Sequence, residues 1–227
     1  MSKQDSGVAE RLYFDEHQWA TVESAMARIL PTDHEPGARE ANTVGFVDRY
    51  LSGIGYIYAK PDGSGFEELV GLQADAWRQR VESLRDTYAE GIAELDRRSN
   101  ERFDEDFRHL TEDRQDEILA EMETAAPPME TEREEEATAG FEPPSVAEAP
   151  EPGMQQVENE FEMEFFELLV LHTRQGFYCD PIYGGNTDRV GWDVIGFPGP
   201  ASLEEVYSGR YTTLPYFANQ DSHREAR

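Results

Sequence analysis

Apolar residues recur at helical spacing along most of this chain, and the clearest pattern begins at residue 161. Large apolar side chains return there every three or four positions, with a second apolar stripe beside the first. A helix that is apolar on most sides is buried, so we expect this helix at the centre of a helical core. Gly176 is expected to end it in a left-handed conformation. The first stripe is Phe161, Phe165, Leu168, Leu169 and His172, and the second is Met163, Phe166 and Val170.

The first helix of the chain has a start signal and a stop signal. Asp15 is a candidate N-cap with Gln18 three residues later, which is the spacing of a capping box, and Pro31 closes the segment. The apolar stripe between these signals is Trp19, Val22, Met26, Ile29 and Leu30.

Three further helical segments are expected in the first half of the chain. One begins at Ala38. A long one covers residues 66–98, with breaks near Gly71 and Gly91 because glycine is a poor helix former. The last of the three runs over residues 111–122.

After the central helix pattern, turn-forming residues alternate with large rings. Glycines permit tight or positive-φ backbone, and rings can anchor an ordered loop to a surface. Loops of this kind more often carry function than cover a core. The rings are Phe177, Tyr178, Tyr183, Trp192 and Phe197, and the turn formers are Asp180-Pro181, Gly184-Gly185-Asn186, Gly191 and Pro198-Gly199.

Together these patterns predict a mainly α fold. It is a single-domain helical bundle with a long irregular glycine- and aromatic-rich C-terminal loop and tail. The stretch rich in proline and glutamate cannot bury enough apolar area to offset chain entropy, so it is expected to be disordered. The parts are a mobile N-terminus (1–12), the first part of the helical core (13–122), the acidic insert (123–156), the central helix and loop (157–200) and an aromatic tail (201–227).

The charge of the chain limits its partners. The 227 residues carry a formal net charge of -28, which would repel nucleic acid and anionic membrane surfaces, and we expect neither as a partner. Lysine occurs only at Lys3 and Lys60, so arginine supplies nearly all positive charge. This composition is typical of a halophile; the alternative is an ordinary acidic protein whose balance is skewed by the insert.

The sequence contains no apolar run of the ~18 to 20 residues that a membrane span needs. Its opening, MSKQDSGVAERLYF, has neither a twin-arginine pair nor a hydrophobic signal core. We therefore expect cytoplasmic residence and no direct membrane insertion, with export alongside a signal-bearing partner as the alternative.

Side chains able to do chemistry are few, and no catalytic, cofactor-binding or metal-binding residue is assigned. Cys179 is the only cysteine, which excludes an internal disulfide and a haem-attachment motif. His172 lies on the apolar stripe and is interpreted as a hydrogen-bonded core histidine. Asp33, His34 and Glu35 are adjacent in a turn, where three side chains rarely converge on one ion, and are interpreted as solvated.

Two segments resemble one known family. The run from Thr173 through GFYCDPIYGGN to GWDVIGFPG is similar to the C-terminal motif of the gluconate 2-dehydrogenase subunit 3 family. The segment FDEHQWATVESAMARILPTDHEPGAREANTVGFVDRYL resembles the opening of the same family, in which a helix ends in a Pro-Thr-Asp turn and PGA leads into a second helix. The resemblance covers the chain apart from the acidic insert and the tail.

The resemblance implies a non-catalytic small subunit of an FAD-dependent sugar dehydrogenase of the gluconate or glucose type. A large GMC-type flavoprotein subunit would bind FAD, and a cytochrome subunit is a further candidate member. We expect the loop and tail to become ordered on that large subunit, because interface centres favour large rings and arginine. The expected contacts are Tyr178, Asp180, Tyr183, Asn186, Arg189 and Trp192.

Two other functions stay open at this point. One is an independent acidic helical protein with an interaction or regulatory role. The other is an enzyme with an unrecognised carboxylate site, which would require turnover or bound metal in the isolated chain.

The charge analysis generates a test of the halophilic interpretation. Raising potassium chloride from about 0.1 M to about 1 M shortens the Debye length from about 10 Å to about 3 Å and screens the self-repulsion of the acidic chain. We expect the thermal unfolding midpoint, followed by circular dichroism, to rise across this range. A midpoint that stays constant or falls would favour the ordinary acidic protein.

Overall fold

The computed structural model of the protein describes residues 11–125, 160 and 163–212. Within these residues the chain is helical and forms no strand, apart from an isolated bridge between Ala59 and Phe66, so the predicted mainly α fold is confirmed. Residues 123–125, the first three of the predicted insert, form the end of helix α4 (Glu112–Ala125), and the rest of the insert and most of the aromatic tail lie outside the described residues. The α-helices are α1 (Glu16–Ile29), α2 (Thr43–Ser52), α3 (Gly71–Phe103), α4 (Glu112–Ala125), α6 (Phe165–Tyr178), α7 (Val190–Val194) and α8 (Leu203–Tyr207). Short 3-10 helices are η1 (Ile54–Tyr56), η2 (Phe107–His109), η4 (Pro181–Tyr183) and η5 (Thr187–Arg189).

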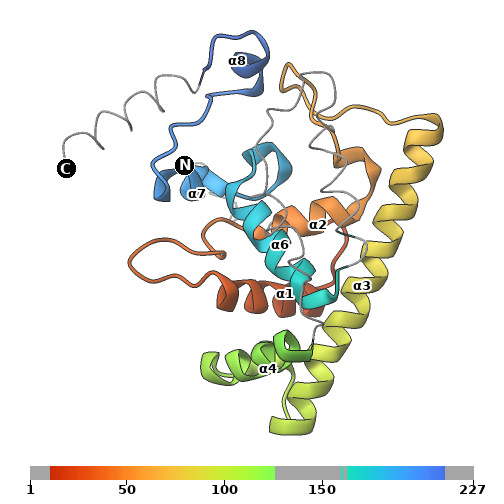
Figure 1. Cartoon of the computed structure of the whole chain (residues 1–227), viewed down its shortest axis with the longest axis vertical. Coiled ribbons are helices and arrows are strands. Elements are labelled where there is room, and N and C mark those ends of the chain that lie inside the picture. Colours follow the sequence, from red (N-terminus) through yellow and green to blue (C-terminus); the bar gives the residue numbers. More distant parts are fainter. Residues whose placement is uncertain (1–10, 126–159, 161–162, 213–227) are drawn as a thin grey trace, which may run out of the picture.

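Helix α6 lies at the centre of the bundle, as predicted. It contacts α1, α2, α3 and α4, and Figure 1 shows it surrounded by the other helices, with the long α3 along one side. Leu168, Leu169 and His172 are fully buried on it. The helix begins at Phe165, four residues after the point where the apolar pattern starts.

The capping box of α1 is confirmed. The Asp15 side chain accepts a hydrogen bond from the Gln18 amide at 2.8 Å, and the Gln18 side chain accepts one from the Asp15 amide at 3.1 Å. Helix α1 then ends at Ile29, before Pro31. Near its end Arg28 pairs with Asp116 of α4 through two hydrogen bonds of 2.7 and 2.9 Å, which ties α1 to α4.

Asp48 of α2 holds the start of the described chain. Its carboxylate accepts hydrogen bonds from the backbone amides of Leu12, Tyr13 and Phe14 at 2.6, 3.0 and 2.7 Å. The side chain is nearly fully buried, so these three amides supply the hydrogen bonds that water would otherwise make. The backbone at Leu12 is therefore fixed, although this residue was assigned to the mobile N-terminus.

Helix α2 begins later than predicted. The chain does not re-enter a helix at Ala38, because the Ala38 amide donates to the carbonyl of Leu30 at 2.8 Å and closes a turn. Asn42 then adopts a left-handed conformation with φ 54°, and the helix starts at Thr43. Gly53, with φ 144°, follows the last turn of the helix.

The predicted boundary near Gly71 is present, but residues 66–70 before it are not helical, and the predicted break near Gly91 is wrong. Helix α3 begins at Gly71, which has φ 62°, and then continues without interruption to Phe103. Gly91 lies inside it because the ring of Phe165 packs directly on its Cα: a Cβ added at Gly91 would lie 2.0 Å from Cγ of that ring. Gly91 therefore leaves space for Phe165 of α6 to pack against α3, and it does not end α3.

Gly176 was also misinterpreted as a helix end. Helix α6 continues to Tyr178, and Gly176 does not have positive φ. A Cβ added at Gly176 would lie 3.1 Å from Cα and the carbonyl oxygen of Thr43, so glycine allows α6 to approach the first turn of α2. The tight contact replaces the expected left-handed cap.

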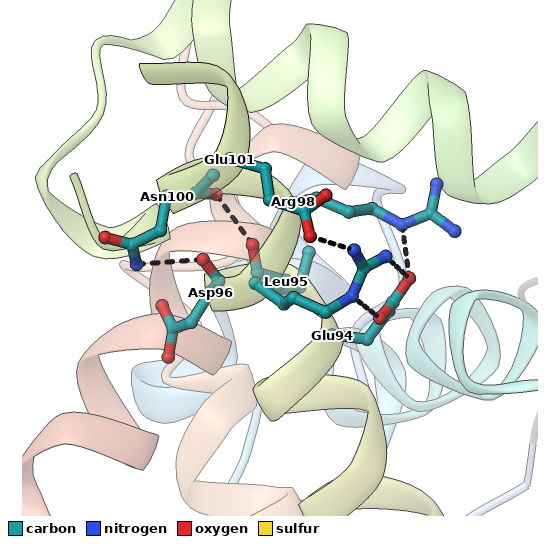
Figure 2. Close-up of polar contacts among 8 residues, drawn as sticks. Glu94, Leu95, Asp96, Arg98, Asn100 and Glu101 are labelled. Carbon is teal, nitrogen blue, oxygen red and sulfur yellow. Dashed lines mark hydrogen bonds and ion pairs between the residues drawn. The ribbon is translucent and has the colours of Figure 1, made fainter. Parts of the chain in front are cut away.

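The solvent face of α3 carries a chain of ion pairs. Figure 2 shows the carboxylate of Glu94 between two guanidinium groups, and it lies 2.7 Å from Nε of Arg97 and 2.6 Å from Nε of Arg98. These hydrogen bonds, that from Arg97 first, lower the pKa of Glu94 to about 2. Arg102 continues the series and binds Glu117 and Glu121 of α4. Exposed pairs of this kind contribute about 0.2–1 kcal/mol each, so apolar burial and not charge pairing dominates the α3 contacts.

The packing at Gly91 predicts the effect of adding one methyl group. Although alanine improves helix propensity by about 1 kcal/mol, we expect Gly91→Ala to destabilise the protein by a net 1–3 kcal/mol or so, because the buried Phe165 ring must shift. Urea unfolding followed by circular dichroism measures this change. The matched control is Gly55→Ala, where no atom lies within 4 Å and φ is not positive, and which is expected to leave stability nearly unchanged. A double variant, Gly91→Ala with Phe165→Leu, should recover part of the loss; full additivity of the two substitutions would contradict the steric cause.

Candidate functional site

The two segments that carry the family resemblance meet in the fold. The amide of Thr187 donates to the carbonyl of Ala41 at 3.1 Å, and the side-chain amide of Asn42 donates to the carbonyl of Gly184 at 3.0 Å. Arg49 of α2 donates from Nη1 to the carbonyl of Ile182 at 2.6 Å. The loop after α6 is thus bound along the start of α2, and the two segments form one packed unit.

Glycines make this unit possible by direct backbone contact. A Cβ added at Gly185 would lie 2.1 Å from the carbonyl oxygen of Gly176, and one added at Gly191 would lie 1.9 Å from the carbonyl oxygen of Phe177. Neither position has positive φ, so the need is for space and not for an unusual conformation. The loop after α6 folds back directly onto the last turn of that helix.

Asn186 is the polar centre of the loop. It is fully buried, its Nδ2 donates to the carbonyl of Cys179 at 2.9 Å, and its Oδ1 accepts from the amide of Gly191 at 2.9 Å. One side chain therefore joins the end of α6 to the start of α7. Its backbone has φ 47°, a left-handed conformation that asparagine tolerates better than most residues.

Trp192 connects α7 to α6. Its indole Nε1 donates to the carbonyl of Tyr178 at 2.8 Å, and its ring packs edge-on against Phe197 at a centroid distance of 5.3 Å. The guanidinium of Arg189 lies 5.7 Å from the centre of the Trp192 ring and donates to the carbonyl of Ala201 at 3.1 Å. Phe197 in turn contacts Tyr211, so a series of rings supports the chain that follows.

The loop contains unusual backbone next to these contacts. Asp188 and Arg189 both have positive φ, at 54° and 64°, which costs each side-chain-bearing residue roughly 1–2 kcal/mol. Such conformations persist where the surrounding contacts determine them. The loop is therefore ordered by its own chain, which differs from the expectation that it acquires order on a partner.

The six expected contact residues fall into three groups by burial. Asn186 and Trp192 are buried, with 0% and 6% exposure, and they hold the loop together. Tyr178 is 44% exposed. The remaining three are partly buried: Asp180 caps η4, Tyr183 packs on Phe66 and Arg189 stacks on Trp192. Contact of any of the six with a partner stays a prediction.

The structure contains a buried polar cluster around His172. The burial of His172 was predicted from the sequence, but the other members of the cluster were not. The hydroxyl of Tyr88 lies 2.9 Å from Nδ1 of His172, and Nε2 of the same ring lies 3.9 Å from Oε1 of Glu160. Tyr50 donates its hydroxyl to the other oxygen of Glu160 at 3.1 Å. The cluster joins α2, α3 and α6 to Glu160, which lies in the chain ahead of α6. No sequence signal marks Glu160, which is one of several alternating glutamates in NEFEME.

Burial determines the protonation of this cluster. It raises the pKa of Tyr88, so the phenol keeps its proton, and we assign that proton as donated to Nδ1 of His172. Nε2 then carries the ring hydrogen, which faces Glu160 but makes no hydrogen bond. Burial lowers the pKa of His172 to about 3 and raises the pKa of Glu160. His172 is accordingly a neutral core residue, in agreement with its interpretation from the sequence.

Cys179 and the turn at Asp33 and His34 are the other candidate reactive groups in the described part of the chain. Cys179 is a free thiol whose pKa is raised to about 12, mainly by burial, which makes it a poor nucleophile at neutral pH. Asp33 and His34 are exposed, and the described residues include no group of three or more His, Cys, Asp or Glu side chains placed to hold a metal ion. None of the described helices combines the length and apolar character needed to cross a bilayer.

The lowered pKa of His172 predicts a pH effect with a defined sign. Below its ordinary pKa of 6.5 the unfolded chain binds a proton at His172 that the folded chain does not, so stability falls as pH falls from about 6.5 toward 3. Replacing His172 by Gln keeps an acceptor for Tyr88 and removes this proton. We expect the loss of unfolding free energy between about pH 7 and about pH 5 to be smaller in the variant, by roughly 1 kcal/mol per pH unit below 6.5.

The measurement is urea unfolding of both proteins at each pH. The raised pKa of Glu160 acts with the opposite sign, but Glu160 is present in both proteins and its effect largely cancels in the comparison. Equal losses in wild type and variant would show that His172 is not the group responsible.

Comparison with known proteins agrees with the site. A family model described as gluconate 2-dehydrogenase subunit 3 matches residues 16–199, from the start of α1 to the end of the loop that packs on α2 and α6. No curated protein and no solved structure matches the chain. The match spans well over half of the 227 residues and includes both segments that build the site, which confirms the resemblance; the chain belongs to the gluconate 2-dehydrogenase subunit 3 family.

Proposed function

We propose that this chain is the small, non-catalytic subunit of an FAD-dependent sugar dehydrogenase of the gluconate or glucose type, and that it stabilises and matures the flavoprotein large subunit. Membership of the gluconate 2-dehydrogenase subunit 3 family carries the proposal. The partner is a GMC-type flavoprotein, and a cytochrome subunit is a further candidate member of the complex.

The use of side chains within the chain supports a structural and not a catalytic role. The groups that could do chemistry near the loop are engaged in its own packing: His172 with Tyr88, Asn186 with two backbone groups, and Cys179 under the loop. The loop presents its turns and Tyr178 outward, on a backbone that its own contacts hold in place. Preorganised surfaces of this kind lower the entropic cost of binding.

We assign FAD to the partner. The flavin would accept hydride from a sugar hydroxyl there, and this chain would hold the flavoprotein in a folded, flavin-binding state. The described residues of this chain do not fit a flavin. An open depression between α3 and α4 is lined by Arg98, Ala120, Glu121 and Thr124, without a ring to stack on, and the glycine-rich loop packs on the backbone of α6.

Coexpression tests the proposal. The candidate large subunit, a GMC-type FAD-dependent dehydrogenase from the same genome, is produced with and without this chain, and soluble yield, FAD content per polypeptide and sugar oxidation with an artificial acceptor are measured. With the small subunit at about 100 times its Kd, binding alone adds about 2.7 kcal/mol to the stability of the large subunit, so we expect a several-fold higher yield of flavin-loaded protein.

Two variants of this chain serve as matched controls. Gly191→Ala forces the loop away from Phe177 and is expected to lose the effect, whereas Gly55→Ala meets no atom within 4 Å and is expected to retain it. A large subunit that is equally soluble, flavin-loaded and active without this chain would reject the role. A stable monomer that never copurifies with the flavoprotein would favour the independent interaction or regulatory protein.

A further inference from the structure

Exposed apolar side chains concentrate in one short part of the described chain. Nine large apolar side chains are exposed in the described residues, and five of them lie between positions 178 and 207. We call these five the α7–α8 face. Its members are Tyr178 (44% exposed), Val194 (36%), Ile195 (48%), Val206 (47%) and Tyr207 (77%).

The element that carries the most exposed of these side chains cannot be stable by itself. Helix α8 has five residues and buries none of them, whereas isolated helices of fewer than about 12–15 residues are marginal in water. In Figure 1 it lies at the edge of the molecule, at the opposite end from α4. A helix so short, with Val206 and Tyr207 turned to solvent, needs a surface to pack on.

Ring contacts and hydrogen bonds within the chain nevertheless hold the α7–α8 face in place. Trp192, Phe197 and Tyr211 form the series of rings that links α7 to the chain beyond α8. The amide of Tyr211 donates to the carbonyl of Glu205 at 2.9 Å, and Arg189 donates to the carbonyl of Ala201. The buried ring of Trp192 and the partly buried rings of Phe197 and Tyr211 thus support the segment, while the five side chains of the face are exposed.

The charges around the face indicate what charge a binding partner must carry. Asp188, Asp193 and Glu204 are exposed beside the apolar residues, and the only exposed cation of α8 and its following turn, Arg210, is already paired with Glu204 at 2.7 Å. A second copy of this chain, with net charge -28, would bring acidic rims together and be repelled. A different protein whose apolar patch is ringed by arginine or lysine is complementary.

We propose that the α7–α8 face is the surface through which this chain binds its flavoprotein subunit, and that the matching face of that subunit has an apolar centre and a basic rim. This inference rests on the proposed function and adds the location and chemistry of the contact. Val206 and Tyr207 are the expected anchors, because Tyr207 is the most exposed of the five side chains and aromatic residues carry a large share of the binding energy of an interface.

The test measures the Kd between purified wild-type or variant chain and the candidate flavoprotein large subunit from the same genome, by biolayer interferometry at fixed salt. The variant V206D/Y207D places two carboxylates on α8 at the expected anchors. The matched control V70D/L72D adds the same charge at two side chains that are 71% and 89% exposed at the start of α3. We expect the Kd to rise by more than about 30-fold for V206D/Y207D and by less than about threefold for V70D/L72D.

The outcomes separate the inference from the function on which it rests. Since α8 buries no residue, both variants should keep the helical spectrum and unfolding midpoint of the wild type, which circular dichroism checks. Wild-type binding with an unchanged Kd for V206D/Y207D overturns the α7–α8 face and leaves the proposed function intact. Equal weakening by both double variants also overturns it, because added charge anywhere would then suffice. No binding by the wild type overturns both, and a wild-type dimer that V206D/Y207D dissociates assigns the face to a second copy.

Discussion

The fold depends on the close approach of α6 to α2 and of the following loop to both. Gly176 lets the two helices touch at backbone distance, and Gly185 and Gly191 let the loop return onto the last turn of α6. Side chains at these three points would push the elements apart, and the hydrogen bonds of Asn186 could not form at their observed lengths. The close backbone contact is therefore the condition under which the hydrogen bonds of the loop can form.

This dependence explains why two segments far apart in the sequence carry one family resemblance. The turn before α2 supplies a carbonyl from Ala41 and a side-chain amide from Asn42, and the loop after α6 supplies their partners at Thr187 and Gly184. Each segment is half of a single contact surface. The ion pairs along α3, by contrast, lie on the solvent face and take no part in that contact surface.

Much of the architecture could be predicted because its signals are local. Helical periodicity located the central helix, and Asp15 with Gln18 identified the start of α1. Glycine was the main source of error. A sequence shows that Gly91 and Gly176 are glycines, but not whether they provide positive φ or space, since that depends on Phe165 and Thr43, which lie far away along the chain.

The same limit applies to the polar groups of the site. The burial of His172 followed from its place on the apolar stripe, yet nothing local distinguishes Glu160 from the glutamates around it, because its environment is built by Tyr50 and Gln175 from two other parts of the chain. Asn186 was recognised as a turn former, while its role in joining α6 to α7 became visible only with both ends of the loop in place.

The carboxylate of Asp48 has one more consequence. By gathering the amides of Leu12, Tyr13 and Phe14 onto α2, it anchors the chain just before the first helix and isolates the bundle mechanically from whatever is joined upstream. Sequence added ahead of Arg11, of any length or composition, would pull against a buried three-point attachment and not against the capping box of α1. Changes of the chain upstream of this attachment therefore place no load on the first turn of α1.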